Sequence, residues 1–208
     1  MGLRIWGRLS SVNVQKVVWC ADELGIDYER LDAGGAFGVN DTAGYLAKNP
    51  AGLVPVIEED DGFVLPESNA IVRYLAARQG ASGLWPEALR DRAQVDRWME
   101  WQSTEFTPAM RDAFWQLIRV PGAQRDAQAV EASRAKSERM AGILDGQLAS
   151  RRYVAGDRFT VADIVNGCAA HRWLNLPLRR EKRPHLERWY AELSLRPASR
   201  QVTSQALS

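Results

Sequence analysis

The segment LVPVIEEDDGFVLPESNAIVRYLA, residues 53–76, constrains the fold more than any other part of the chain. Two apolar runs, VPVI and FVL, flank EEDDG, whose glycine predicts a β-hairpin. The SNAIVRYLAAR that follows places Ile71, Tyr74 and Leu75 at helical spacing. Pro55 stands inside the first apolar run, although proline removes a ladder donor and is normally kept out of sheet interiors. Its presence indicates a role other than strand stability.

The residues before this hairpin predict the other half of the same sheet. LRIW (3–6) and YERLDA (28–33) read as strands, and residues 10–25 between them read as a helix with apolar Val14, Val17, Val18 and Leu24. A glycine-rich loop, AGGAFG, and a short helix, DTAGYLAKN, then lead into the hairpin. The predicted order is βαβαββα, ending near Arg78, with a parallel and an antiparallel half.

Everything after this unit reads as helix. QGASGLWPEALR (79–90) carries two glycines and a proline, which suits a linker. We predict an α/β domain at 1–78, a linker at 79–88 and an all-helical C-terminal domain at 89–208. The expected helices cover about 88–119, bent at Pro108, and then 126–149, 160–174 and 184–195. In DRFTVADI, Thr160 and Asp163 predict a capping box at the start of one of them.

Charge and cysteine content exclude several classes of function. Lys and Arg number 27 against 26 Asp and Glu in 208 residues, so no basic field predicts nucleic-acid binding. No apolar stretch reaches membrane-spanning length. The two cysteines, Cys20 and Cys168, are too few for a disulfide framework. These features predict a soluble, cytoplasmic protein that contacts neither nucleic acid nor membrane.

Glu67 and Ser68 stand where a helix begins, directly after the hairpin. The unpaired N–H groups of a helix start, together with the Ser68 hydroxyl, suit a carboxylate, and the Glu67 carboxylate suits an ammonium. The main chain of Val54, beside Pro55, could pair with an extended peptide. Together they fit an α-amino-acid head group on a short peptide. The alternatives are a plain edge-strand proline, a capping serine and a solvated glutamate.

These motifs, in this order, resemble the cytosolic glutathione S-transferases, in particular serine-type bacterial members of theta, zeta or nu type. The resemblance rests on GLVPV, the hairpin, LPESNAI, YL and FTVADI, and covers nearly the whole chain. It implies a thioredoxin-like N-terminal domain and a helical second domain. It also implies a cis Pro55, a Val54 that pairs with the cysteinyl backbone of glutathione, and Glu67 and Ser68 that hold the γ-glutamyl end.

The same resemblance places the chemistry at the start of the first helix. Counting back from ELGIDYE puts Ser11 at the thiol-activating position, and S-x-N-x-x-K-V is similar to a bacterial pattern in which the asparagine, here Asn13, helps to hold the sulfur. A hydroxyl donor at a helix N-terminus favours a thiolate. The chain lacks a Cys-x-x-Cys there, so the reactive sulfur must come from the ligand. The alternative is that both residues only form the first turn of the helix.

Some positions depart from the family pattern or stay open. Leu53 stands where many members have lysine, which leaves the anchor of the glycyl carboxylate unassigned. Residues that could line a co-substrate site between the domains are Arg8, Trp98, Trp101, Phe106, Arg111, Phe114 and Trp115. An aromatic stripe at helical spacing is more often core. Cys168 and His171 share a helical spacing, but no further ligand accompanies them, so no metal is expected.

The predicted activity is conjugation of the glutathione thiolate to small hydrophobic electrophiles, with glutathione as co-substrate. The alternatives are glutathione-dependent reduction of peroxides or disulfides, and a non-catalytic glutathione or hydrophobic-ligand binding protein. The resemblance further implies a homodimer.

Overall fold

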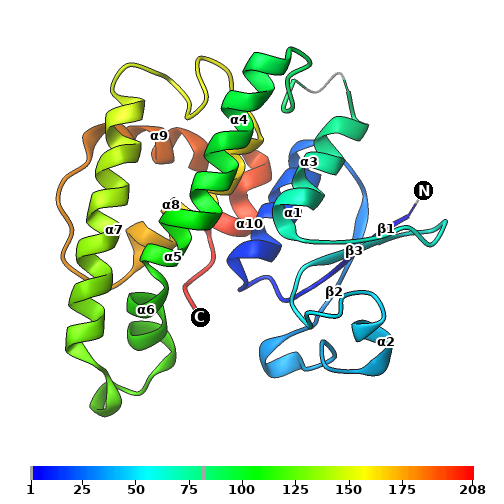
Figure 1. Ribbon diagram of the computed structural model, residues 1–208, viewed down its shortest axis with the longest axis horizontal. Helices are drawn as coiled ribbons and strands as arrows, with labels where there is room; N and C mark the ends of the chain where they lie inside the picture. Colours follow the sequence, from blue (N-terminus) through cyan, green and yellow to red (C-terminus); the bar gives the residue numbers. More distant parts are fainter. Residues whose placement is uncertain (1, 81–82) are drawn as a thin grey trace.

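A computed structural model describes residues 2–80 and 83–208 of the protein (Figure 1). Its four strands form one mixed sheet in the order β2-β1-β3-β4. β1 (Leu3–Trp6) runs parallel to β2 (Tyr28–Leu31) and antiparallel to β3 (Val56–Glu59), and β4 (Val64–Pro66) pairs antiparallel with β3. Both predicted halves of the sheet are therefore present. β3 begins at Val56, later than the run VPVI suggested, because Pro55 has no N–H to donate to a ladder.

The two faces of the sheet bury different side chains, because successive residues of a strand point to opposite sides. Leu3, Ile5 and Ile57 pack against α1 (Val12–Glu23) and α3 (Ser68–Arg78) in the main hydrophobic core. Val56 lies on the other face with Ala33 and with Tyr45 of the short helix α2 (Ala43–Leu46).

The helix predicted at 10–25 is shorter at both ends in the structure. It is α1, which runs from Val12 to Glu23 and has Ser11 as its N-cap.

The second half of the chain is helical, as predicted. Figure 1 shows it beside the sheet, with α7 at the edge farthest from the strands. Its helices are α4 (Leu89–Trp101), α5 (Thr107–Ala109), α6 (Arg111–Phe114), α7 (Ala127–Leu148), α8 (Val161–Asn175), α9 (Pro184–Ser194) and α10 (Arg200–Thr203). Within the described residues, 2–80 and 83–208, no helix is long and apolar enough to cross a membrane.

The single helix expected at 88–119 is divided in the structure. π-helical turns occupy Gln102–Phe106 and Trp115–Arg119, and Met110, with φ −92° and ψ 0°, separates α5 from α6. Pro108 leaves one carbonyl of the preceding turn without an N–H donor, and widened turns accommodate such a loss. The prediction of one bent helix was therefore wrong in detail.

α3 ends at Arg78 and α4 begins at Leu89. Residues 81 and 82 of the predicted linker, and residue 1 of the predicted first domain, lie outside the described residues.

The two halves share one hydrophobic core. α1 packs directly on α8, and Arg196 forms an ion pair with Glu23 of α1. Asn69 of α3 donates to the carbonyl of Met99 in α4 at 3.0 Å. These contacts fix the position of the start of α1 relative to the helical half.

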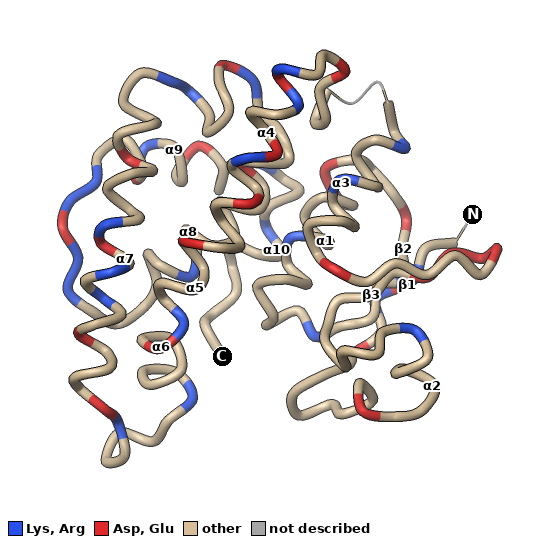
Figure 2. The backbone as a smooth tube through the Cα atoms, in the orientation of Figure 1, with Lys and Arg blue, Asp and Glu red and all other residues tan. Residues whose placement is uncertain are grey.

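Acidic and basic residues are interspersed along the backbone tube in Figure 2. This distribution agrees with the formal net charge of +1.

Candidate functional site

The chain enters β3 through a cis peptide bond between Val54 and Pro55. The Leu53 carbonyl accepts hydrogen bonds from Tyr45 Oη and Asn49 Nδ2, both at 2.8 Å. These two bonds hold the chain in place directly before Val54. Within the described residues, the main-chain N–H and C=O of Val54 form no hydrogen bond. These two groups are consequently available to an extended peptide ligand.

α3 begins with an unusual backbone geometry. Glu67, its N-cap, has φ +72°, a left-handed conformation that costs a non-glycine residue about 1 kcal/mol or more. Its carbonyl still accepts the N–H of Ile71 at 2.9 Å, so the helix is intact. The Glu67 carboxylate is exposed and forms no ion pair within the described residues. Ser68, the next residue, is buried at the helix start.

A polar pocket of about 300 Å³ lies between these elements. Asn13 of α1 faces Glu67 and Ser68 of α3 across it, and the region where α4 ends closes the far side. Its lining residues are Asn13, Lys16, Glu67, Ser68, Asn69, Ala70, Arg73, Glu100, Gln102, Ser103 and Thr107. Three of the predicted site residues therefore meet in one cavity, although Asn13 is distant in sequence from Glu67 and Ser68.

Lys16 is a site residue that sequence reasoning missed. Its side chain is 2% exposed, and Nζ lies 3.2 Å from Asn69 Oδ1 and 3.5 Å from Ser68 Oγ. No carboxylate of the described residues lies within ion-pair distance, and burial lowers the pKa of Lys16 to about 8. The available signal was that Lys16 follows Asn13 by three residues, and therefore shares its helical face, within an otherwise apolar run.

Ser11 occupies the N-cap position of α1, but its side chain makes no capping hydrogen bond. Its main-chain N–H donates to the Arg8 carbonyl at 3.1 Å, which folds the preceding loop back onto the helix start. The hydroxyl of the half-buried Ser11 is therefore not used as a hydrogen-bond acceptor by the first turn of α1. That geometry disfavours the simple capping alternative for Ser11.

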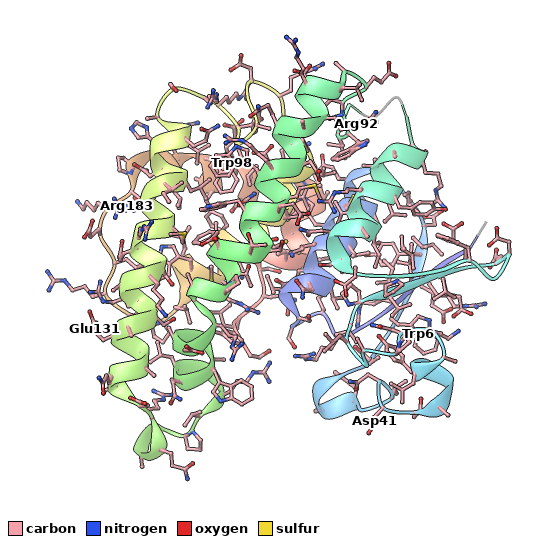
Figure 3. The ribbon with its side chains drawn as sticks, viewed as in Figure 1. Trp6, Asp41, Arg92, Trp98, Glu131 and Arg183 are labelled. Carbon is pink, nitrogen blue, oxygen red and sulfur yellow. The ribbon has the colours of Figure 1, made fainter. Side chains whose placement is uncertain are left out.

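The proposed co-substrate aromatics separate into two groups. Trp98 is 5% exposed and Phe106 is fully buried, so both belong to the core, and Figure 3 places Trp98 inside the helical half. Trp101 is partly buried and stacks on Phe106 with ring centroids 5.4 Å apart. Trp115, by contrast, is 59% exposed.

Two of the other co-substrate candidates lie where the two halves meet, and one lies outside. The Phe114 ring lies under the Arg172 guanidinium, whose Cζ is 4.0 Å from the ring centroid. Arg8 lies against the loop that contains Gly35, where a Cβ would come within 2.9 Å of Arg8 Nε. The Arg111 side chain is 83% exposed and lies 3.6 Å from Asp112.

The cysteine and histidine of α8 have local partners. His171 Nδ1 lies 2.6 Å from Tyr190 Oη, and Nε2 lies 2.9 Å from the Gln205 carbonyl. Cys168 is fully buried, which raises the pKa of its thiol to about 12. Among the described residues, no group of three or more His, Cys, Asp or Glu side chains is arranged to hold a metal ion.

Family models match both parts of the chain. Residues 10–78 match the glutathione S-transferase N-terminal domain, and residues 104–197 match the glutathione S-transferase C-terminal domain. Together these matches cover β2, β3, β4, α1, α3 and most of the helical half, and they leave out β1 and α4.

Individual relatives extend the similarity over nearly the full length. Glutathione S-transferase GstB of Escherichia coli strain K12 is 40% identical over 96% of this chain and 97% of its own. The crystal structure of the theta class glutathione S-transferase of Xanthomonas axonopodis pv. citri with glutathione bound is 44% identical, covers 99% of both chains and superposes with a TM-score of 0.95. A probable glutathione S-transferase, GSTF2 of Oryza sativa subsp. japonica, is 30% identical over 97% of this chain and 96% of its own.

The sheet of mixed strand direction, followed by helices, is accordingly the thioredoxin-like and helical architecture of these proteins, as the sequence predicted. With two domain models matched and relatives of 40% and 44% identity aligned end to end, the chain belongs to the glutathione S-transferase family.

Proposed function

We propose that this transferase binds glutathione in the pocket between α1 and α3 and conjugates it, through its thiolate sulfur, to small hydrophobic electrophiles. The observation that carries the proposal is the meeting of Asn13, Glu67 and Ser68 around one polar cavity. The Xanthomonas relative, which is described with glutathione bound, supports the choice of ligand.

Each part of glutathione has a matching group. Ser68 and the free N–H groups at the start of α3 would bind the γ-glutamyl carboxylate, and the exposed Glu67 would bind the ammonium. The unpaired N–H and C=O of Val54 would pair with the cysteinyl residue, as a neighbouring strand would.

The sulfur would then lie at the start of α1. A free thiol has a pKa of about 8.5, and a hydrogen bond from the Ser11 hydroxyl at the positive end of a helix stabilises the thiolate. Asn13, two residues further along the chain in the first turn of α1, would orient the same sulfur. The thiolate forms a C–S bond with the electrophile while the leaving group departs with its electron pair.

The test is a pH titration of the ultraviolet absorbance of the bound glutathione thiolate. In wild type we expect the band to appear about two pH units below the free thiol, and Ser11→Ala should move it back by about one to two units. Asn13→Ala should move it by less. Ser10→Ala, which alters the neighbouring hydroxyl, is the matched control.

A thiolate band that appears at the same pH in Ser11→Ala as in wild type would refute the role of Ser11. Glutathione binding without any thiolate band would indicate a carrier or a disulfide-form reductase in place of a transferase.

Three further proposals accompany this one. The cysteine content motivates a cytoplasmic location, the residue pattern motivates domain limits at 1–78 and 89–208 with a linker at 79–88, and the resemblance motivates a homodimer. Light scattering tests the last, because a dimer has twice the 23.3 kDa mass of the chain. A mass near that of one chain would contradict it.

A further inference from the structure

Lys16 of α1 is a buried amine that the proposed chemistry does not use. The residue is 2% exposed and lines the polar pocket, with Nζ 3.2 Å from Asn69 Oδ1 and 3.5 Å from Ser68 Oγ. Both acceptors are neutral, and no carboxylate of residues 2–80 and 83–208 lies within ion-pair distance of Nζ. A buried ammonium without a counter-ion is costly, so this position favours a ligand that brings a negative charge.

The contact with Lys16 leaves the hydroxyl hydrogen of Ser68 free. An ammonium group can only donate, so the Ser68 oxygen accepts in this contact. In the part of the chain that the structure describes, no acceptor takes the Ser68 hydroxyl hydrogen, and Ser68 itself lines the pocket. A ligand carboxylate that accepts this hydrogen would therefore complete a chain of hydrogen bonds from Lys16 through Ser68 to the ligand.

The groups around Lys16 explain why it is only weakly basic. α1 packs against both α3 and α8. The titratable or charged side chains that face Lys16 or line its pocket from neighbouring helices are Cys168, Arg172, Glu67, Glu100 and Arg73. Burial is the largest cause that lowers the pKa of Lys16 to about 8, and the charge of Arg172 lowers it further, whereas Glu67 and Glu100 raise it. A Cys168 thiolate would also raise it, but burial raises the pKa of that thiol to about 12, so it is uncharged near pH 8.

We propose that Lys16 positions Ser68 for the γ-glutamyl carboxylate of glutathione, and that binding of the peptide draws a proton from solvent onto Lys16. This inference rests on the proposed function and adds a positioning residue and a coupled proton to the same site. The proton binds to Nζ, and no covalent bond of glutathione changes. The carboxylate stabilises the ammonium through Ser68, and the glutathione ammonium beside Glu67 offsets part of this effect. We expect protein with protonated Lys16 to bind the ligand about tenfold more tightly than protein with neutral Lys16.

This coupling has a definite dependence on pH. At about pH 6.5, Lys16 is protonated in the free and in the bound protein, so binding takes up no proton there. Near pH 8, Lys16 is neutral in about half of the free molecules, and binding should take up about 0.4 protons per ligand. The affinity for the ligand should accordingly fall as the pH rises through 8.

Calorimetry with S-methylglutathione measures this proton, because this ligand has no thiol that could release one. Titrations in buffers with different ionisation enthalpies give the number of protons taken up. At pH 8 we expect about 0.4 more protons for wild type than for Lys16→Met, and at pH 6.5 equal numbers. The amino group of the ligand contributes equally to both proteins and cancels in this difference. The control, Lys136→Met, removes an exposed lysine of α7 and should match wild type.

A double-mutant cycle tests whether Lys16 acts through Ser68. Lys16→Met should weaken the binding of S-methylglutathione at pH 7 by about tenfold, because a charge-assisted hydrogen bond to Ser68 is lost. In a Ser68→Ala background the same change should weaken binding by less than about threefold. Equal factors in the two backgrounds would overturn the positioning role, because a residue that only supports the fold would give them.

A measurement on wild type does not depend on the folding of any variant. With isotopically labelled lysine, NMR should show one lysine Cε resonance that titrates near pH 8 in the free protein and at a higher pH with S-methylglutathione bound. A resonance that titrates at the same pH with and without the ligand would overturn the coupled proton.

These results separate the role of Lys16 from the activation of the thiol. If the Lys16-dependent proton is taken up while Ser11→Ala leaves turnover unchanged, the assignment of Ser11 fails and that of Lys16 stands. If turnover depends on Ser11 but wild type and Lys16→Met take up equal numbers of protons at pH 8, the inference about Lys16 fails alone. If neither glutathione nor S-methylglutathione binds, the proposed function and this inference both fail.

Discussion

Lys16 shows how one buried charge couples the site to the stability of the protein. It lies at the floor of the polar pocket, with Ser68 and Asn69 as its hydrogen-bond partners and no carboxylate of the described residues in ion-pair contact. Burial is the main cause that lowers its pKa to about 8. The folded protein therefore binds the Lys16 proton more weakly than the unfolded chain, whose lysines titrate near 10.4.

This difference predicts a pH dependence of stability with a definite sign. Between the folded pKa of about 8 and the unfolded value, the unfolded state holds more protons, so the free energy of unfolding rises with pH. Relative to Lys16→Met, wild type should gain about 2 kcal/mol between about pH 7 and about pH 9.5. Urea denaturation of both proteins across this range measures the gain.

The control for this experiment is Lys136→Met, which removes an exposed lysine from α7. The quantity to compare is the free energy of unfolding of wild type minus that of Lys16→Met. If this difference stays constant or falls as the pH rises, Lys16 is not a buried, weakly basic group.

At the scale of secondary-structure elements, the start of α8 was predicted and its full role was not. The capping box is confirmed: Asp163 Oδ2 accepts the main-chain N–H of Thr160 at 2.9 Å. The same carboxylate also accepts the N–H of Val154 and Nε1 of Trp189, both at 2.9 Å through Oδ1. One side chain thus joins the α7–α8 loop, the start of α8 and α9.

Truncation of Asp163 should consequently cost much more than the loss of a helix cap. Asp163→Ala leaves three buried donors without acceptors, so we expect the free energy of unfolding to fall by about 3 kcal/mol or more. An ordinary cap contributes about 1 kcal/mol. Urea denaturation measures the loss, with Asp157→Ala, at an exposed position of the same loop, as the control. A loss of about 1 kcal/mol or less would mean that Asp163 is only a cap.

Elements were predictable where the signal is local. Residues 53–76 contain their own turn and their own periodicity, so the hairpin and α3 lie close to where the sequence placed them. The region after α4 differs from its prediction, because apolar spacing cannot distinguish an α-helix from the π-helical turns that accommodate Pro108.

Site residues followed the same rule. Pro55, Glu67 and Ser68 lie within one short segment, whereas the contact of both Arg119 and Arg172 with Phe114 depends on how distant elements pack. No spacing in the sequence indicates that these two arginines lie over the same ring.

At the scale of the whole molecule, the helical half is held to the sheet domain by a close contact between α1 and α8. Gly167 of α8 lies against Trp19 of α1, and a Cβ at this glycine would be 2.9 Å from two atoms of the buried indole and 3.0 Å from Leu193. In sequence, a glycine within a helix indicates only lower helix propensity. The structure places it at the contact between the two halves.

The sign of the effect of a glycine-to-alanine change should therefore differ between two helices. Gly146→Ala in α7, where a Cβ meets nothing within 4 Å, should raise the free energy of unfolding by about 0.5–1 kcal/mol through helix propensity. Gly167→Ala should lower it by about 1–3 kcal/mol, because the fully buried Trp19 ring cannot move aside without displacing its neighbours. Thermal and urea denaturation of the two variants provide the comparison. If Gly167→Ala is stabilised as much as Gly146→Ala, α1 and α8 can separate without cost, and the core that fixes the site between the two halves is not rigid.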